Sequence, residues 1–182
     1  MSTIILPEVD LSKRSNAIRK VLSTIAPARQ TPAVQRAINA QTYTLAAFQG
    51  SQPRDHFRDW RFKTINASFR AGFFEVWVPY SDLKWKLEKC YLHLYETIRR
   101  PDPEEKEYLA LHCDPQLYKP GVQFQYKCGP HLHPKAAHGP LSASHIALNA
   151  SHLNEVFASF DSLWTAFESA VTMIKKEVLE SS

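Results

Sequence analysis

Histidines are concentrated in one short segment of this chain. Four of its eight histidines, His131, His133, His138 and His145, lie within fifteen residues. Proline and glycine residues surround them and the segment follows an expected strand, so the imidazoles would sit on a loop held by a rigid scaffold, a common location for functional side chains. Imidazole suits proton transfer because its ordinary pKa is about 6.5. The segment is therefore the first candidate for an active site.

The spacing of polar residues on the expected strands brings further side chains toward the same place. His131 and His133 are two residues apart, so in a strand they point to one face. His112 and Asp114 have the same spacing at the end of another expected strand, and His145 begins a third. If these three strands are neighbours, the five side chains converge in one pocket. This convergence is the central expectation from the sequence.

One chemistry for such a pocket is cleavage of RNA without a metal or any other cofactor. His133 and His145 would serve as general base and general acid. His131 and Asp114 would orient them, and Lys127 would contact the phosphate. The chain would then be a His-dependent ribonuclease.

Two other interpretations of the same residues remain open. Imidazoles are common ligands of divalent metals, so His112, His131 and His133 could hold a metal ion in a metal-dependent hydrolase. Alternatively, the histidines are structural and the chain is a non-catalytic adaptor or subunit. In that case its amphipathic N-terminal helices would bind nucleic acid or a protein partner.

Charge is distributed unevenly along the sequence. Residues 1–80 contain eleven Lys and Arg against five Asp and Glu, whereas residues 81–182 contain eleven against thirteen. A basic half suits an anionic partner, of which nucleic acid is the commonest, although a solvated basic helix face gives the same count. The expected nucleic-acid contacts are Lys13, Arg14, Arg19, Lys20, Arg54, Arg58, Trp60 and Arg61.

Four short sequence elements carry a family resemblance. They are Leu111-His112-Cys113-Asp114, Gly129-Pro130-His131-Leu132-His133, Ser144-His145-Ile146 and a helix expected from Asn154. Together they resemble small bacterial toxin-like proteins of the TumE type and neighbouring uncharacterised bacterial families. The resemblance covers about a third of the chain. It implies an mRNA-cleaving role in a toxin–antitoxin or phage-defence system, with a cognate antitoxin or defence-complex protein as partner.

The apolar pattern predicts an α+β fold. Helices are expected over 12–26, over 31–50, over 81–99 and from 154 onward, and strands over 61–69, 73–78, 108–113, 122–128 and 146–148. The predicted order is ααββαβββα. It corresponds to a mostly antiparallel sheet of about five strands, with two N-terminal helices, one mid-chain helix and a long C-terminal helix.

Length and composition predict the domain organisation and location. A chain of 182 residues is the size of one domain, with a basic helical portion over 1–50 and an α+β core over 61–182. No apolar run reaches the roughly 18 residues of a membrane span, and residues 1–10 do not resemble a signal peptide. The three cysteines show no CxxC spacing, which favours a reducing, cytoplasmic location.

Overall fold

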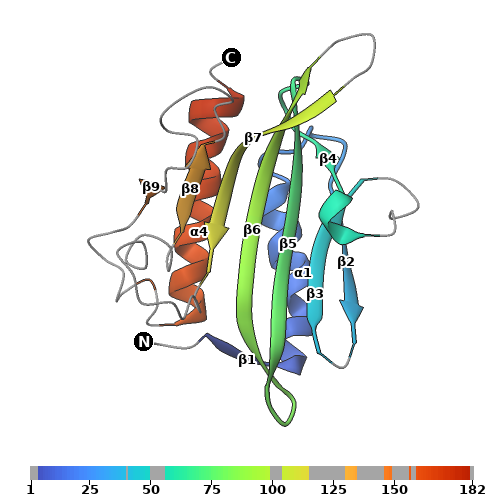
Figure 1. Ribbon diagram of the computed structural model, residues 1–182, viewed down its shortest axis with the longest axis vertical. Helices are drawn as coiled ribbons and strands as arrows, with labels where there is room; N and C mark the ends of the chain where they lie inside the picture. The colour runs from blue at the N-terminus through green and yellow to red at the C-terminus, as the bar shows by residue number, and fades with distance from the viewer. Residues whose placement is uncertain are drawn as a thin grey trace.

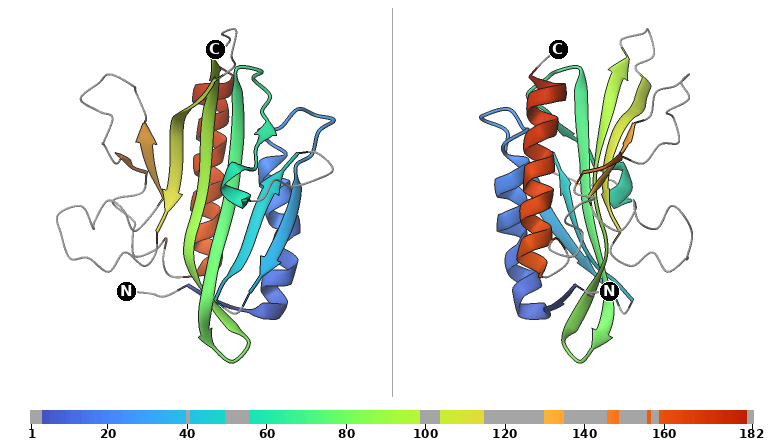
Figure 2. Two further views of the ribbon diagram at one scale, coloured as in Figure 1. Left: turned by 45° about the vertical axis from the view of Figure 1, so that its right-hand side comes forward. Right: turned by 90° about the vertical axis from the view of Figure 1, so that its left-hand side faces the viewer.

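The structure is an antiparallel sheet with helices on one face. A computed structural model describes residues 4–39, 41–49, 56–98, 104–114, 130–134, 146–148, 156 and 159–180. Within these residues, helices α1 (Glu8–Leu22) and α4 (Phe160–Ile174) lie side by side against the same face of a nine-stranded sheet (Figures 1 and 2). None of the described helices has the length and apolar character that crossing a membrane requires.

Every strand pair in the described sheet is antiparallel. The order across the sheet is β2-β3-β5-β6-β7-β8-β9, while β1 pairs with β6 and β4 pairs with β5. The strands are β1 (Ile5–Pro7), β2 (Ala33–Ile38), β3 (Tyr43–Phe48), β4 (Phe62–Lys63), β5 (Phe69–Ser81), β6 (Lys84–Ile98), β7 (Glu104–Cys113), β8 (His131–Pro134) and β9 (Ile146–Ala147). A short 3-10 helix, η1 (Phe57–Asp59), precedes β4, and a π-helical turn, η3 (Lys175–Leu179), extends α4.

The hydrophobic core lies between the sheet and the two helices. Alternate residues of β6, Cys90, Leu92 and Leu94, face the helices and are at most 3% exposed. Helix α4 contributes an apolar stripe, and its Phe167 meets Phe73 of β5 edge to face, with ring centroids 5.8 Å apart. The opposite face of the sheet carries neither helix, so polar side chains there can form a site.

A buried ion pair fixes α1 to the sheet. Arg14 of α1 and Glu75 of β5 are 5% and 1% exposed, and Arg14 Nη2 donates to Glu75 Oε1. Trp77 Nε1 donates to the other carboxylate oxygen over 3.1 Å. The guanidinium also lies 4.0 Å from the ring centroid of Trp164 and 4.5 Å from that of Phe160. Arg14 is therefore an interior residue that joins α1, β5 and α4.

The predicted fold class was wrong in its balance of helix and strand. The segment 31–50, expected to be a helix, forms β2 and β3, and the expected mid-chain helix over 81–99 is β6. The basic portion 1–50 is thus only partly helical. Of the predicted helices, only the first and the last correspond to helices of the structure. The expected strand over 122–128 lies outside the described residues.

Turn chemistry explains the first of these errors. Val34, Ile38 and Leu45 can be placed on one helix face, which suggested a helix. However, Asn39 Oδ1 accepts hydrogen bonds from the backbone N–H of Gln41 at 2.9 Å and of Thr42 at 2.8 Å. Asparagine side chains that bond to the backbone in this way stabilise turns. The turn reverses the chain and lets β2 pair with β3 along its full length.

Candidate functional site

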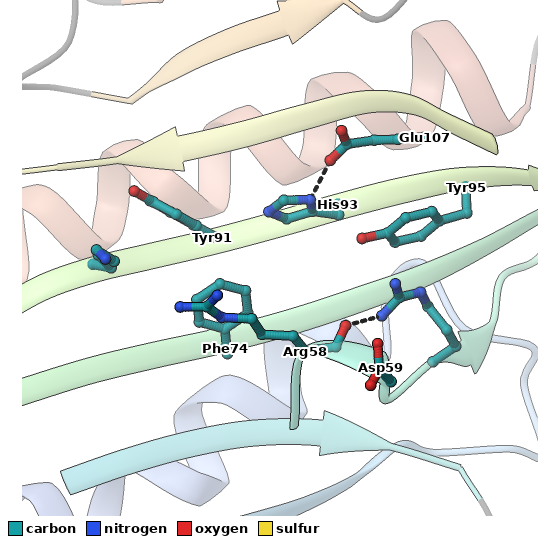
Figure 3. Close-up of a pocket in the computed structure, with 9 residues that line it drawn as sticks. Arg58, Asp59, Phe74, Tyr91, His93, Tyr95 and Glu107 are labelled. Carbon is teal, nitrogen blue, oxygen red and sulfur yellow. Dashed lines mark hydrogen bonds and ion pairs between the residues drawn. The ribbon is translucent and has the colours of Figure 1, made fainter. Parts of the chain in front are cut away.

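The face of the sheet opposite the helices contains a pocket of about 450 Å³. Residues Tyr91, His93 and Tyr95 alternate along β6 with the core residues and point to this face (Figure 3). The 3-10 helix η1 and the residues after it form one side of the pocket. The residues that line it are Arg58, Asp59, Arg61, Phe74, Lys89, Tyr91, His93, Tyr95 and Glu107.

Strand register places four imidazoles on this same face. His112 of β7 pairs with Tyr91 of β6 on one side and with His131 of β8 on the other. In the next row, Ala110 of β7 pairs with His93 and with His133. Directly opposed residues of adjacent strands share a face, so these two rows form a continuous cluster of rings. Ala110 is the only small side chain among the six and leaves room for its neighbours.

The rings of this cluster are in close contact. The His112 ring stacks on Tyr91, with centroids 3.8 Å apart and planes at 14°. Its centroid lies 4.4 Å from that of His133, and the His131 and His133 centroids are 4.8 Å apart. One ring nitrogen from each of these three histidines lies within 4.8 Å of the other two. His131 is fully buried, whereas His112 and His133 are partly buried. We call these three residues the histidine triad.

His93 connects the triad to the pocket. Its Nδ1 is hydrogen-bonded to Glu107 Oε1, so Nδ1 carries the proton in this contact, because a carboxylate only accepts. Its Nε2 lies 3.2 Å from Nε2 of His112. The result is a chain of contacts from Glu107 through His93 to His112. Such a carboxylate–imidazole arrangement fixes the tautomer and the orientation of the ring.

Asp114, which the sequence predicts to orient a catalytic imidazole, lies beside Tyr91. Its Oδ1 accepts a hydrogen bond from the Tyr91 hydroxyl, and its side chain is only 9% exposed. Burial, reinforced by the negative charge of Asp114, raises the pKa of Tyr91 well above its usual range. Tyr91 therefore remains a hydrogen-bond donor at physiological pH. Asp114 holds the tyrosine ring on which His112 stacks.

Two of the predicted nucleic-acid contacts lie at the pocket. Arg58 is exposed at its rim, and Arg61 donates to the Trp60 carbonyl oxygen at 3.0 Å while its guanidinium stacks 3.7 Å from the centre of the Tyr95 ring. Burial raises the pKa of Tyr95. Trp60 itself is 8% exposed and packs against Phe48, with centroids 4.9 Å apart, so it supports the rim from inside.

Four other predicted contacts, all on α1, are separated from the pocket. Lys13, Arg19 and Lys20 are exposed on α1, beyond the helix-covered face of the sheet, and Arg14 is buried next to Glu75. Figure 2 shows α1 on one side of the sheet, and the pocket lies on the other side. Three further predicted residues, Arg54, Lys127 and His145, lie outside the described residues.

Sequence reasoning missed His93, Glu107 and Lys89. The first and last of these were assigned to a helix, and Glu107 was assigned to an acidic linker. The alternation of Tyr91, His93 and Tyr95 with apolar residues is a strand pattern that could have identified His93. No comparable signal exists for Glu107, because a β-bulge places it on this face. Tyr95 pairs with Glu107 and Leu94 with Leu109, which leaves Tyr108 as the extra residue.

Comparisons with known proteins give no match for this chain, whether with family models, curated proteins or solved structures. The function must therefore be argued from the geometry of the site itself.

Proposed function

We propose that this protein is a His-dependent ribonuclease that cleaves single-stranded RNA in the pocket on the open face of the sheet. One observation carries the proposal. A carboxylate-held imidazole, His93 with Glu107, lies in the same pocket as the cationic side chains Arg58 and Lys89. A phosphodiester is an anion whose cleavage requires proton transfer. In this pocket Arg58 and Lys89 can bind the anion, and His93 can transfer the proton.

The proposed reaction uses these groups as follows. His93 accepts the proton of a ribose 2′-hydroxyl, and the 2′-oxygen attacks the adjacent phosphorus. The bond from phosphorus to the 5′-oxygen breaks, and that oxygen takes a proton from a neighbouring imidazole, His112. The products are a 2′,3′-cyclic phosphate and a 5′-hydroxyl. Arg58 and Lys89 balance the charge on the phosphate during the transfer.

The aromatic rings in the pocket suit an RNA substrate. Phe74, Tyr91 and Tyr95 line it beside the cations. Bases of a single strand stack on such rings while the backbone contacts Arg and Lys. This proposed acid–base pair differs from the pair His133 and His145 expected from the sequence, which stays a prediction. His133 remains adjacent, 4.4 Å from His112 between ring centroids, and its expected partner His145 lies outside the described residues.

The biological setting is part of the proposal. RNA cleavage would fit a cytoplasmic toxin–antitoxin or phage-defence system, as the resemblance to TumE-type proteins implies. A cognate antitoxin or defence-complex protein would then be the partner of the chain.

A cleavage assay in chelator tests the proposal. Labelled single-stranded RNA is incubated with purified protein in EDTA, and the products are analysed for cyclic phosphate ends. We expect cleavage by the native chain and a loss of about 100-fold or more in His93→Ala, because a positioned general base contributes roughly that much. Absence of cleavage by the native chain, or equal cleavage by His93→Ala, would contradict the proposal.

A matched pair of arginine variants tests where RNA binds. Arg58→Ala removes a charge at the rim of the pocket, and Arg19→Ala removes the same charge from the opposite side of the sheet. We expect Arg58→Ala to weaken RNA binding and to reduce its salt dependence, and Arg19→Ala to leave both unchanged. Equal effects of the two substitutions would mean that RNA does not bind specifically at the pocket.

A further inference from the structure

The histidine triad concentrates three imidazoles where packing alone would favour apolar side chains. His131 is fully buried, and a neighbouring position on the same strand pair, Ala110, is also fully buried. Buried polar nitrogens need partners, and a metal ion that accepts imidazole lone pairs is one such partner.

The triad has the composition and spacing of a metal site. Its three candidate ligand atoms lie within 4.8 Å of one another. Around a tetrahedral zinc ion, with Zn–N bonds of about 2.0–2.1 Å, ligand nitrogens lie about 3.3 Å apart. The triad reaches that spacing with side-chain movements on the order of 1 Å. The fourth coordination position would then be available to water or to another ligand.

Rigid elements hold the three ligands. Two of them, His112 and His131, are direct partners in the β7–β8 ladder, and His133 follows on the same face of β8. Sites built on strands keep their geometry better than sites on loops.

His112 is also supported from outside the triad. Tyr91 stacks on its ring and is anchored by Asp114, while His93, anchored by Glu107, contacts its Nε2. Partners of this kind orient the ligands of metal sites.

We infer that His112, His131 and His133 bind one divalent transition-metal ion, with zinc as the ion of choice. Neutral imidazole ligands suit zinc, cobalt, nickel and copper, whereas magnesium and calcium prefer oxygen ligands. The inference does not depend on the ribonuclease activity. An ion held by His112 would stop this residue from donating a proton to RNA, so the cleavage proposed above belongs to the metal-free form of the chain, and zinc would inhibit it. This is the reason for the chelator in the cleavage assay.

Direct titration of zinc into the full chain tests the inference without RNA. Protein stripped with chelator and dialysed is titrated with zinc chloride by calorimetry and against a chromogenic zinc indicator. We expect one ion per chain, a higher melting temperature with zinc and no binding of magnesium. Intense visible absorption of the cobalt complex would indicate tetrahedral coordination by the triad.

Variants identify the ligands. His112→Gln and His133→Gln should each lower zinc affinity by more than the 10–100-fold that loss of an outer partner causes. His56→Ala is the matched control, because His56 is exposed and lies outside the triad. It should bind zinc as the native chain does. Circular dichroism of each variant establishes that it is folded, and Glu107→Gln, which removes the anchor of His93, should lower zinc affinity by no more than about 10–100-fold.

The inference fails if the native chain takes up less than one zinc ion. It also fails if the folded His112→Gln and His133→Gln proteins bind zinc like the native chain, since the ion would then be held by other histidines. Because RNA is absent, neither result depends on the outcome of the cleavage assay.

Discussion

Replacement of Arg14 by methionine should lower the free energy of unfolding by about 3–5 kcal/mol, the usual cost of breaking a buried ion pair by removing one partner. Glu75 is only 1% exposed and would lose its opposite charge. Its remaining donors are neutral: the Trp77 indole at 3.1 Å and the Cys90 thiol at 3.9 Å. For a chain of this size, about 2–4 °C of melting temperature corresponds to each kcal/mol, so the midpoint should fall by roughly 6–20 °C.

Urea denaturation, followed by far-ultraviolet circular dichroism and tryptophan fluorescence, measures this loss. The double variant Arg14→Met with Glu75→Gln should recover part of the stability, because the penalty comes from an isolated buried charge. Lys13→Met is the matched control. Lys13 is the adjacent basic residue on α1, is 71% exposed and pairs with Asp10 on the same helix. Its removal should leave the denaturation midpoint almost unchanged.

Two results would refute this reasoning. One is a native-like midpoint for Arg14→Met. The other is a loss of stability in the double variant equal to the sum of the two single losses, which would mean that Arg14 and Glu75 do not interact. Arg14→Met also tests the expectation from the sequence that Arg14 contacts nucleic acid. Because Arg14 is buried, the RNA affinity of the folded variant should equal that of the native chain.

Three further substitutions test the packing around the site. Burial raises the pKa of the Cys90 thiol above its ordinary value of 9.0, so the unfolded chain ionises first and stability should fall as pH rises above that value. In urea denaturation from pH 8 to 11, Cys90→Ala should reduce the slope of the unfolding free energy against pH by up to about 1.4 kcal/mol per pH unit. An unchanged slope would contradict the raised pKa of Cys90. Tyr91→Phe removes the hydroxyl that donates to the buried Asp114 and should cost about 1–3 kcal/mol by the same assay, whereas native stability would mean that the carboxylate has another sufficient donor. Gly72→Ala would place a Cβ 3.0 Å from the Trp60 carbonyl oxygen and 3.0 Å from Arg61 Nη1. It should cost about 1–3 kcal/mol and weaken RNA binding by displacing the pocket rim, and a variant with native stability and affinity would show that the rim adjusts freely.

The segment that forms β6 was predicted to be a helix because its apolar residues fit two periods. Its residues Leu87, Tyr91, Leu94 and Tyr95 can be read with helical spacing, and the same stretch also alternates, with Cys90, Leu92 and Leu94 on one face. Both periods fit because β6 is covered by helices on one face and by aromatic pocket residues on the other. Hydrogen-bonded pairing with β5 and β7 makes this segment a strand. Such pairing between distant segments cannot be predicted from the spacing of residues within one segment.

The site could be predicted where it depends on spacing within one strand. His131 and His133 are two residues apart, and that spacing alone places them on one face. Their meeting with His112 additionally requires that β7 and β8 be neighbours in one particular register. Spacing within each strand specifies neither that adjacency nor the register, because both depend on pairing between distant segments. His93 could not be included while its segment was assigned to a helix.

The bulge at Tyr108 explains why the sequence did not predict Glu107 as a residue of the site. Glu107 and His112 are five residues apart, so regular alternation puts them on opposite faces of β7. One extra residue in the strand reverses the alternation beyond it, and Glu107 then shares a face with Tyr95 and His93. Without the bulge, this carboxylate would point toward the helices and into the apolar core, where an unpaired charge is costly. The bulge therefore places the Glu107 carboxylate beside His93 in the pocket, and the proposed chemistry depends on that irregularity.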